Sequence, residues 1–467
     1  MEKSNLNLDI NSDINSDISK GEVKSGRDVG SSDEIKKEIC LLVENYYDVT
    51  FKNKELRLGK DLIQPSGKKF DAEEFKLLVE ASLDGWWTEG RFTKKFERKM
   101  GEFVPVKHVL TTNSGSSANL LALSALTSPK LGERRIRPGD EVIGVAACFP
   151  TTVNPIIQVG CIPVLLDIDK ETYNVNVELL EKAVGPKTKA IFIAHTLGNP
   201  YNLPRVVDIA RRYNLWLIED CCDALGSRYG NQMVGTFGDL ATFSFYPAHQ
   251  ITMGEGGAVI TNDNLLAQEI RSFRDWGRDC WCPPGCQNTC GKRFQWQLGQ
   301  LPSGYDHKYI YSNLGYNLKL TDMQAALGLA QLEKLPSFIE KRKENFSLLW
   351  QGLSKFQHYL QLPRATEHAD PCWFGFLLSL TKNCLFSREK LTQYLNERGV
   401  GTRLLFSGNI TKQPYFESVT YRVVGTLENS DYAMNNTFWI GVHPSITKEH
   451  ISYMVHCFEE FFRNERL

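Results

Sequence analysis

Hydrophobic residues in this chain form short runs that alternate with helix-length stretches. From about Val106 to Thr261 these runs are rich in β-branched and aromatic residues, and segments with helical periodicity separate them. Such alternation is typical of an α/β architecture with a largely parallel sheet. The predicted strands read KHVLTT, EVIGVAA, IPVLLDID, KAIFIAHT, LWLIED, ATFSFY and GAVIT.

The flanking segments predict a division into four parts. Residues 1–34 contain an imperfect repeat of Asp, Ile, Asn and Ser without useful periodicity, so we expect a disordered tail. Two amphipathic helices are predicted within 35–105, and they should pack on the main domain. We expect that domain at 106–340, with a cysteine-rich insertion at 276–305, and a smaller α+β domain at 341–467.

Length and charge exclude several classes of protein. A chain of 467 residues is long enough for two or more structural units. Its 54 Lys and Arg residues against 55 Asp and Glu residues give a formal net charge of -1, without the basic excess of nucleic-acid-binding proteins. Apolar runs are too short to cross a bilayer, and the N-terminus lacks the order of a secretory signal. We therefore expect a soluble cytoplasmic protein that binds neither nucleic acid nor membranes.

A group of small residues follows the first predicted strand. Residues 111–120 read TTNSGSSANL, with a strand before them and an apolar helix after them. Small residues that open a helix expose backbone N–H groups at the positive end of the helix dipole, which suits a phosphate. The alternative is a capped helix start without a ligand, because serine is a common N-cap.

The strand LWLIED ends in two acids, Glu219 and Asp220. Ligands of α/β sheets bind beyond the carboxyl ends of the strands. A pyridine cofactor needs a carboxylate there to keep its ring nitrogen protonated, and that protonation makes the ring an electron sink. The alternative is a solvated acid where the strand meets a loop.

Cysteines are concentrated in two places. The chain contains twelve, and six of them form two groups, Cys221 with Cys222, and then Cys280, Cys282, Cys286 and Cys290. In a large cytoplasmic chain such groups favour a metal or catalysis over disulfides. Four clustered cysteines suit tetrahedral zinc, although the Cys-x-Cys spacing at 280–282 is tighter than the usual Cys-x-x-Cys of zinc ribbons.

Five stretches in a fixed order carry a resemblance to a known family. NSGSSA, ACFPTTVNPI, IEDCCDALGS, FSFYPAHQITMGEGG and GYNLKLTDMQAALG, within roughly residues 60–460, resemble the DegT/DnrJ/EryC1/StrS sugar aminotransferases. The cysteine-rich stretch RDWGRDCWCPPGCQNTCGKRF and the stretch GTRLLFSGNITKQPYF are similar to the 3-dehydrases of that family. The resemblance implies a fold type I pyridoxal phosphate architecture, with a mainly parallel sheet in a large domain and a smaller α+β C-terminal domain.

The resemblance also implies a site for pyridoxal or pyridoxamine 5'-phosphate. Gly115, Ser116 and Ser244 would hold the phosphate of this cofactor. Phe149 would lie against the face of its ring, and Asp220 would pair with the ring nitrogen.

Two positions depart from the aminotransferase pattern. His249 stands where the family has the lysine that forms a Schiff base with the cofactor aldehyde, so the covalent tether and ordinary transamination are lost. Histidine still moves protons near neutral pH, and we expect a retained cofactor, a changed reaction and His249 as its base. Asp223 stands where aminotransferases usually carry a glutamine beside the cofactor, and both departures match the 3-dehydrases.

The metal site is implied by the same resemblance. Cys222, Cys280, Cys282 and Cys290 are separated by 57, 1 and 7 residues, as are the four thiolate ligands of a 2Fe–2S cluster in the 3-dehydrases. Cys286 would be a spare thiol. Because Cys222 lies two residues after the carboxylate expected at the ring nitrogen, a cluster bound there would lie close to the cofactor.

These implications together describe one enzyme. It would remove the C3 hydroxyl of a CDP-linked 4-keto-6-deoxy sugar, with electrons from an iron–sulfur flavin reductase partner, on the route to 3,6-dideoxyhexoses of lipopolysaccharide O-antigen. Asn317 matches a family residue that reaches the phosphate in the neighbouring subunit, which implies a homodimer. The alternatives are a cluster-free enzyme of the same family whose cysteines bind zinc, and an inactive relative that binds or regulates.

Overall fold

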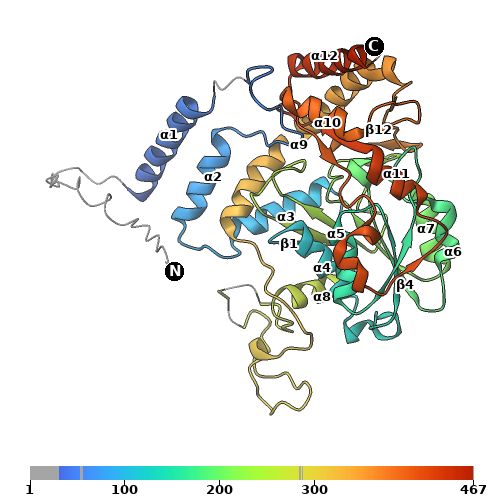
Figure 1. Ribbon diagram of the computed structural model, residues 1–467. Coiled ribbons are helices and arrows are strands. Elements are labelled where there is room, and N and C mark those ends of the chain that lie inside the picture. Colours follow the sequence, from blue (N-terminus) through green and yellow to red (C-terminus); the bar gives the residue numbers. More distant parts are fainter. Residues whose placement is uncertain (1–30, 53–55, 283–284, 287, 466–467) are drawn as a thin grey trace, which may run out of the picture.

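An eight-stranded sheet forms the centre of the protein (Figure 1). The computed structural model describes residues 31–52, 56–282, 285–286 and 288–465. The strand order is β1-β9-β8-β5-β4-β2-β3-β14, and every neighbouring pair from β8 to β14 is parallel. Only β9 runs antiparallel to its neighbours β1 and β8. The strands are β1 His108–Thr112, β2 Glu141–Val145, β3 Ile162–Leu166, β4 Thr188–Ala194, β5 Trp216–Asp220, β8 Leu240–Ser244, β9 Gly257–Thr261 and β14 Arg422–Val423.

All seven strands predicted between residues 106 and 261 are present, and the predicted α/β fold class is confirmed. Alternate residues of β5 face two separate cores: Trp216 and Ile218 pack with α4 and α8, whereas Leu217 packs with α3, α7 and α9. A parallel sheet needs this cover on both faces because its strands are apolar on both sides. The longer helices are α1 Ser32–Thr50, α2 Ala72–Leu83, α3 Arg91–Phe103, α4 Gly115–Ala125, α5 Pro150–Gln158, α7 Leu203–Arg212, α8 Asn264–Arg274, α9 Asp322–Leu353, α10 Arg388–Glu397, α11 Glu428–Asn436 and α12 Lys448–Asn464, and the short α6 is Leu180–Ala183.

A second sheet lies in the C-terminal part of the chain. Its strand order is β10-β12-β15-β13, and a separate apolar cluster joins it to α9, α10 and α12. Its strands are β10 Leu360–Gln361, β12 Gly375–Leu380, β13 Arg403–Leu404 and β15 Thr437–Gly441, while β6 Arg228–Tyr229, β7 Gln232–Met233 and β11 Ala369–Asp370 form a small third sheet. The boundary expected near residue 340 falls inside α9, so the division into domains stays a prediction.

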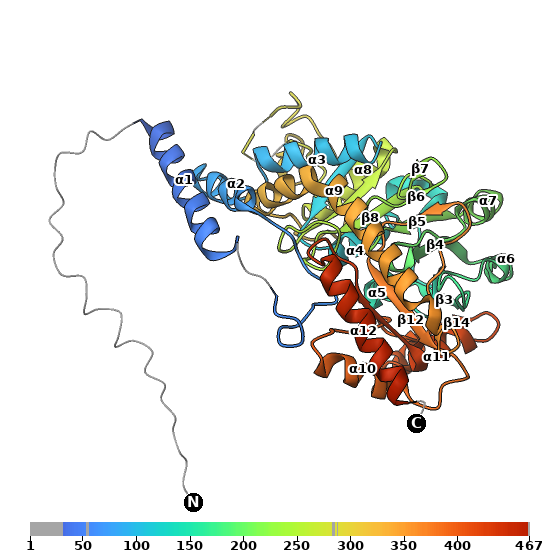
Figure 2. The ribbon, with the colours of Figure 1, turned by 90° about the horizontal axis from the view of Figure 1, so that it is seen from above.

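The N-terminal helices differ in how they are held. Both α1 and α2 begin with a capping box, at Ser31 and Asp71 respectively. Helix α2 packs against α9, whereas α1 packs on α2 and has no buried residue (Figure 2). The tail expected at 1–34 lies outside the described residues except for its end, where α1 already begins at Ser32.

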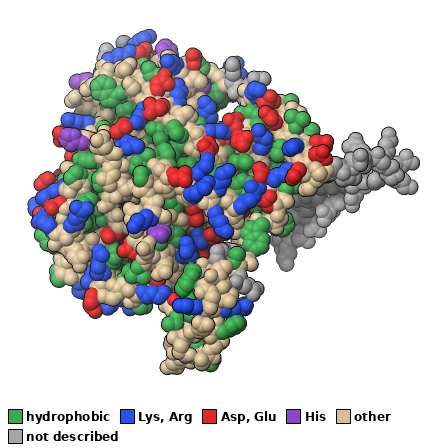
Figure 3. All heavy atoms as spheres, turned by 180° about the vertical axis from the view of Figure 1, so that it is seen from behind, with side chains coloured by type: hydrophobic (Ala, Val, Ile, Leu, Met, Phe, Trp, Pro, Cys, Tyr) green, Lys and Arg blue, Asp and Glu red, His purple; other side chains and the backbone are tan. Residues whose placement is uncertain are grey.

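Charges are mixed over the surface. On the face shown in Figure 3, basic and acidic side chains are interspersed with hydrophobic ones. Among the described residues, no helix combines the length and the apolarity needed to cross a membrane.

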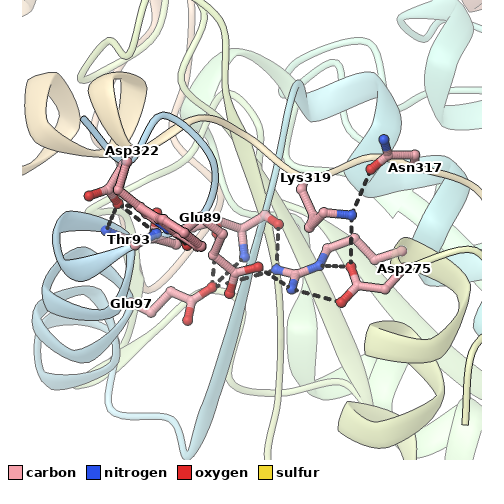
Figure 4. A network of polar contacts seen from close by, with 11 residues as sticks. Glu89, Thr93, Glu97, Asp275, Asn317, Lys319 and Asp322 are labelled. Atoms are coloured by element: carbon pink, nitrogen blue, oxygen red, sulfur yellow. Dashed lines mark hydrogen bonds and ion pairs between the residues drawn. The ribbon is translucent and has the colours of Figure 1, made fainter. Parts of the chain in front are cut away.

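A buried carboxylate fixes the start of α3. Asp322, in the first turn of α9, accepts hydrogen bonds from the backbone N–H groups of Gly90, Phe92 and Thr93 at 3.0, 3.1 and 2.8 Å. It also accepts from the Thr93 hydroxyl at 2.8 Å (Figure 4). Gly90 is the N-cap of α3 and has no side chain to do this, so α9 supplies the cap from elsewhere in the chain.

We expect Asp322→Asn to destabilise the fold by about 2 kcal/mol, because an amide nitrogen at either side-chain position leaves buried N–H donors of α3 without an acceptor. The measurement is chemical denaturation of the full-length protein. Glu340→Gln, at an exposed position of the same helix, is the control and should leave stability unchanged. Equal stability of the two variants would contradict this account of α3.

Candidate active site

The carboxyl ends of β1, β5 and β8 meet in one region of the sheet. Asn119, from α4, connects them: its amide nitrogen donates to Asp220 Oδ2 at 2.9 Å, and its oxygen accepts from the Thr242 hydroxyl of β8 at 2.6 Å. The helix that follows β1 is thereby fixed against the ends of the two strands that carry Asp220 and Ser244.

The start of α4 lies very close to the strand ends. A Cβ atom added to Gly115 would lie 2.4 Å from Ser244 Cβ, and one added to Gly257 would lie 2.4 Å from the Ser114 carbonyl oxygen. Only glycine allows this approach. The Ser114 side chain caps the helix, and the hydroxyl of the exposed Ser116 lies 3.3 Å from that of Thr151. The first N–H groups of a helix lack partners within it, so this turn can hold an anionic group such as a phosphate.

Asp220 is buried, with 4% of its surface exposed, yet it is well provided with donors. Its Oδ2 accepts from Asn119 and, at 2.7 Å, from the Thr152 hydroxyl of α5, while Oδ1 accepts from the Cys222 backbone N–H at 3.1 Å. Such satisfaction is what allows a carboxylate to stay buried. Its orientation is therefore fixed before any ligand binds, as the pairing with a ring nitrogen requires.

Phe149 stands at the same end of the sheet. It is the N-cap residue of α5, half of its side chain is exposed, and its ring meets Phe406 edge to face at 5.6 Å. The first turn of α5 thus carries both the exposed ring and Thr152, the donor to Asp220. A planar ligand bound beside Asp220 would therefore lie close to the ring of Phe149.

His249, which follows β8, forms a pair with Asp223, which follows β5. Their Nδ1 and Oδ1 atoms are 3.4 Å apart, which is an ion-pair distance, but the angles do not make a hydrogen bond. Both side chains are mostly buried, and the Phe374 ring lies 5.2 Å from the imidazole. Burial raises the pKa of Asp223 above its ordinary value, and the neighbouring His249 partly opposes that rise.

The backbone around this pair is held by two buried side chains that the sequence did not reveal. Arg342 of α9 donates to the His249 carbonyl oxygen at 3.0 Å. Gln250 donates to the carbonyl oxygens of Asp223 and Cys372. Asn119 and Thr152 were missed as well, although both lie in stretches that were singled out, as polar residues among small and apolar ones.

Asn317 lies elsewhere, at an exposed position beside a network of charges (Figure 4). Its side-chain oxygen accepts from Lys319 Nζ at 2.7 Å, and Lys319 also lies 3.7 Å from Asp275. Asp275 in turn pairs with Arg274, which is buried and also bonds Glu89. Its expected role toward the phosphate of a second subunit stays a prediction.

The structure brings together three of the four predicted metal ligands. Cys280, Cys282 and Cys290 surround the imidazole of His307, with each sulfur 3.6–4.0 Å from a ring nitrogen. Among ligand atoms of the described residues that all lie within 4.8 Å of one another, Cys280 and Cys282 group with His307. Cys290 approaches the ring of His307 but is not part of this group, and neither is Cys222. Cys286 is exposed, as expected of a spare thiol. Counting histidines as well as cysteines near the insertion is the signal that could have found His307.

A second convergent group is structural. His195, Glu219 and Cys221 lie together, but the Glu219 carboxylate accepts from the backbone N–H groups of Gly235, Phe237 and Gly238 at 2.8–2.9 Å. These bonds hold the turn before β8 against β5, and they leave the carboxylate with little capacity for a metal.

The family is decided by comparison of the whole chain. The model of the DegT/DnrJ/EryC1/StrS aminotransferase family matches residues 68–459. The chain belongs to this family. The matched residues run from just before α2 into α12, so the match to the DegT/DnrJ/EryC1/StrS family covers both sheets and most of the described helices.

Similar proteins of this family have been named and solved. The lipopolysaccharide biosynthesis protein RfbH of Salmonella typhimurium is 61% identical, over 92% of this chain and 99% of its own. The dTDP-4-dehydro-2,6-dideoxy-D-glucose 3-dehydratase of Saccharopolyspora spinosa is 51% identical, over 86% of this chain and 87% of its own. A structure of E. coli GDP-4-keto-6-deoxy-D-mannose-3-dehydratase with bound hydrated PLP matches with a TM-score of 0.76 and 28% identity, over 85% of this chain and 99% of the other.

The raised pKa of Asp223 predicts a pH-dependent stability. A carboxyl whose pKa is higher in the folded than in the unfolded state opposes folding increasingly as the pH rises through the folded-state pKa. Asp223→Asn should therefore raise the melting temperature at about pH 8, and by less at about pH 5. Asp208→Asn, at a position with 52% of the side chain exposed, is the control and should change little at either pH. A lower melting temperature for Asp223→Asn at about pH 8 would contradict the buried, unfavourable carboxylate.

Proposed function

We propose that this protein is a pyridoxamine phosphate-dependent 3-dehydratase of nucleotide-linked 4-keto-6-deoxy sugars. The observation that carries the proposal is His249 itself, a proton-transfer residue at the family's lysine position beside an otherwise complete cofactor cradle. We take CDP-4-keto-6-deoxyglucose as the substrate because the cysteine pattern resembles that of the 3-dehydrases acting on CDP-linked sugars. Two similar proteins are named as 3-dehydratases of dTDP- and GDP-linked sugars.

The described residues fit the cofactor. The glycine-lined start of α4, with Ser116 and Ser244 beside it, offers donors to a phosphate, and the buried Asp220 offers a fixed carboxylate to a pyridine nitrogen. Phe149 supplies an exposed ring beside them. When bound, the cofactor supplies an amine for the sugar ketone and a protonated ring that withdraws electrons.

His249 would act as the base. Its imidazole would take a proton from the C4′ methylene of pyridoxamine phosphate, and it cannot form the covalent bond that a lysine makes there. Asp223, 3.4 Å away, would stabilise the imidazolium that results, because opposite charges attract strongly where both groups are mostly buried. Arg342 would keep the backbone of His249 in place through its carbonyl group.

We also propose that the cysteine-rich insertion holds a 2Fe–2S cluster through Cys222, Cys280, Cys282 and Cys290, and that an iron–sulfur flavin reductase serves as its electron donor. Such a cluster supplies one-electron transfer when bound. The described residues fit it in part: Cys280 and Cys282 lie together beside His307, Cys290 is linked to them only through that ring, and Cys222 lies outside the group. A structural zinc is the second candidate, favoured by the nearby imidazole of His307, since three thiolates and one histidine suit zinc.

The assembly and setting follow from the same resemblance. We propose a cytoplasmic homodimer whose Asn317 reaches the phosphate of the neighbouring subunit, and the exposed position of this side chain is compatible with that reach. The reaction would serve 3,6-dideoxyhexose and O-antigen synthesis, and the 61% identical relative is named for lipopolysaccharide biosynthesis.

The role of His249 predicts the behaviour of His249→Asn. With pyridoxamine phosphate and CDP-4-keto-6-deoxyglucose in deuterated water, solvent exchange at C4′ should fall by roughly 100-fold or more, because asparagine cannot act as a base near neutral pH. Binding of pyridoxamine phosphate, measured by titration, should change little. Exchange at the native rate in this variant would identify another residue as the base.

The cysteine proposal predicts a difference between Cys286 and its neighbours. Protein purified without oxygen should absorb in the visible range as 2Fe–2S proteins do, and serine at Cys222, Cys280, Cys282 or Cys290 should abolish that absorbance. Cys286→Ser is the matched control and should keep its colour, because this thiol is exposed and outside the group. Colourless native protein that contains zinc would decide for the second candidate.

A further inference from the structure

The imidazole of His307 lies in the middle of the cysteine group, and the proposed ligand set gives it no role. We infer that His307 is a positioning residue of the metal centre, which gathers Cys280, Cys282 and Cys290 around one point and donates an N–H···S hydrogen bond to the bound sulfurs. The inference rests on the metal site proposed for the insertion. It concerns contacts to the ligand sulfurs and not a bond to the metal, since the four cysteines of the proposed set already fill the protein positions of a 2Fe–2S cluster.

One ring atom contacts all three sulfurs. Nε2 of His307 lies 3.6 Å from Cys280 Sγ, 3.8 Å from Cys290 Sγ and 4.0 Å from Cys282 Sγ. Nδ1 lies 3.8 Å from Cys290 Sγ as well. A buried histidine that served only the packing of the core would need a single acceptor, whereas this ring has three thiol groups around one nitrogen. The three sulfurs come from two separate turns of the insertion, so the imidazole is their common neighbour.

The ring is held firmly in this position. The His307 residue is fully buried, and Trp296 meets its ring edge to face at 4.8 Å. Its backbone N–H donates to the Arg293 carbonyl oxygen at 2.9 Å, and the Arg293 guanidinium bonds Asp306, the residue before His307, at 2.6 Å. The ring therefore has a fixed position at the base of the insertion, and the positions of the three sulfurs are defined relative to it.

The insertion is closed at the same level by a second set of bonds. The Asp279 backbone N–H donates to the Ile310 carbonyl oxygen at 3.0 Å, and its carboxylate pairs with Lys130 at 2.8 Å. The residue before Cys280 is thus tied to the segment that follows His307. In Figure 1 the chain between α8 and the start of α9 protrudes below the rest of the molecule. Without the imidazole of His307, Cys280, Cys282 and Cys290 would lose the one side chain that contacts all three of their sulfurs.

Hydrogen bonds to metal-bound sulfurs have two known physical consequences. They hold the ligands in orientation, and the loss of such an outer partner typically weakens metal affinity roughly 10–100-fold. They also withdraw electron density from the sulfurs, which favours the reduced form of an iron–sulfur cluster and raises its reduction potential. A side chain that only filled space would do neither, so these two quantities separate positioning from packing.

The test compares His307→Phe, which keeps an aromatic ring but removes the donor, with His307→Gln, which keeps an N–H. His368→Phe changes an exposed histidine and is the control, since 71% of that side chain is exposed. Full-length metal-free protein is titrated with zinc alone. We expect roughly 10-fold weaker binding in His307→Phe, binding closer to native in His307→Gln, and no change in the control. Equal zinc affinity of His307→Phe and native protein would overturn the inference.

The iron-loaded proteins give the second readout. The potential of the cluster, followed by electron paramagnetic resonance during reductive titration, should shift to more negative values in His307→Phe and recover in His307→Gln. An unchanged potential in His307→Phe would overturn the donor role. A strong coupling from nitrogen-15-labelled histidine to the reduced cluster would also overturn it, because His307 would then be a ligand. Failure of the native protein to hold any iron would defeat the proposed electron-transfer function. X-ray absorption spectroscopy of the zinc-loaded native protein then completes the test: a direct bond between zinc and a His307 nitrogen would overturn the inference, whereas weaker zinc binding in His307→Phe without such a bond would support it.

Discussion

The candidate active site depends on one buried carboxylate and its donors. Asp220 stands at the end of a central strand, and its Oδ2 atom takes hydrogen bonds from Asn119 of α4 and Thr152 of α5. An unsatisfied carboxylate at this depth would cost several kcal/mol (about 3–5), so the two helices and the strand are mutually constrained. Because α4 also carries the first turn proposed to hold the phosphate, and Phe149 is the N-cap of α5, the position of Asp220 constrains both.

The proposed role of His249 depends on a backbone that other residues hold in place. The surrounding contacts bind main-chain atoms: Arg342 holds the His249 carbonyl group, and Gln250 holds that of Asp223. The backbone at position 249 is thus held through main-chain atoms, independently of the imidazole, so the side chain at this position can differ without loss of these contacts.

The sequence predicted the parts of the structure that repeat locally. The seven strands followed from β-branched runs. The candidate site residues Gly115 and Asp220 followed from their places at a helix start and a strand end, whereas Ser244 followed only from the family resemblance. Asn119 and Thr152 could not be predicted, because their role arises only when two helices meet one strand. The proposed metal site shows the same limit. The family resemblance grouped four cysteines, but the fold of the insertion brings His307 next to three of them, and sequence distance carries no information about that.

The proposed reaction differs from ordinary transamination in the sugar carbon that changes. The most direct measurement is product analysis, by nuclear magnetic resonance, after the full-length protein is incubated with CDP-4-keto-6-deoxyglucose, pyridoxamine phosphate, glutamate and a chemical reductant. With His249 in place of the tethering lysine, the sugar should lose its C3 hydroxyl and keep its C4 ketone. Formation of a 4-amino sugar with the C3 hydroxyl intact would contradict the account.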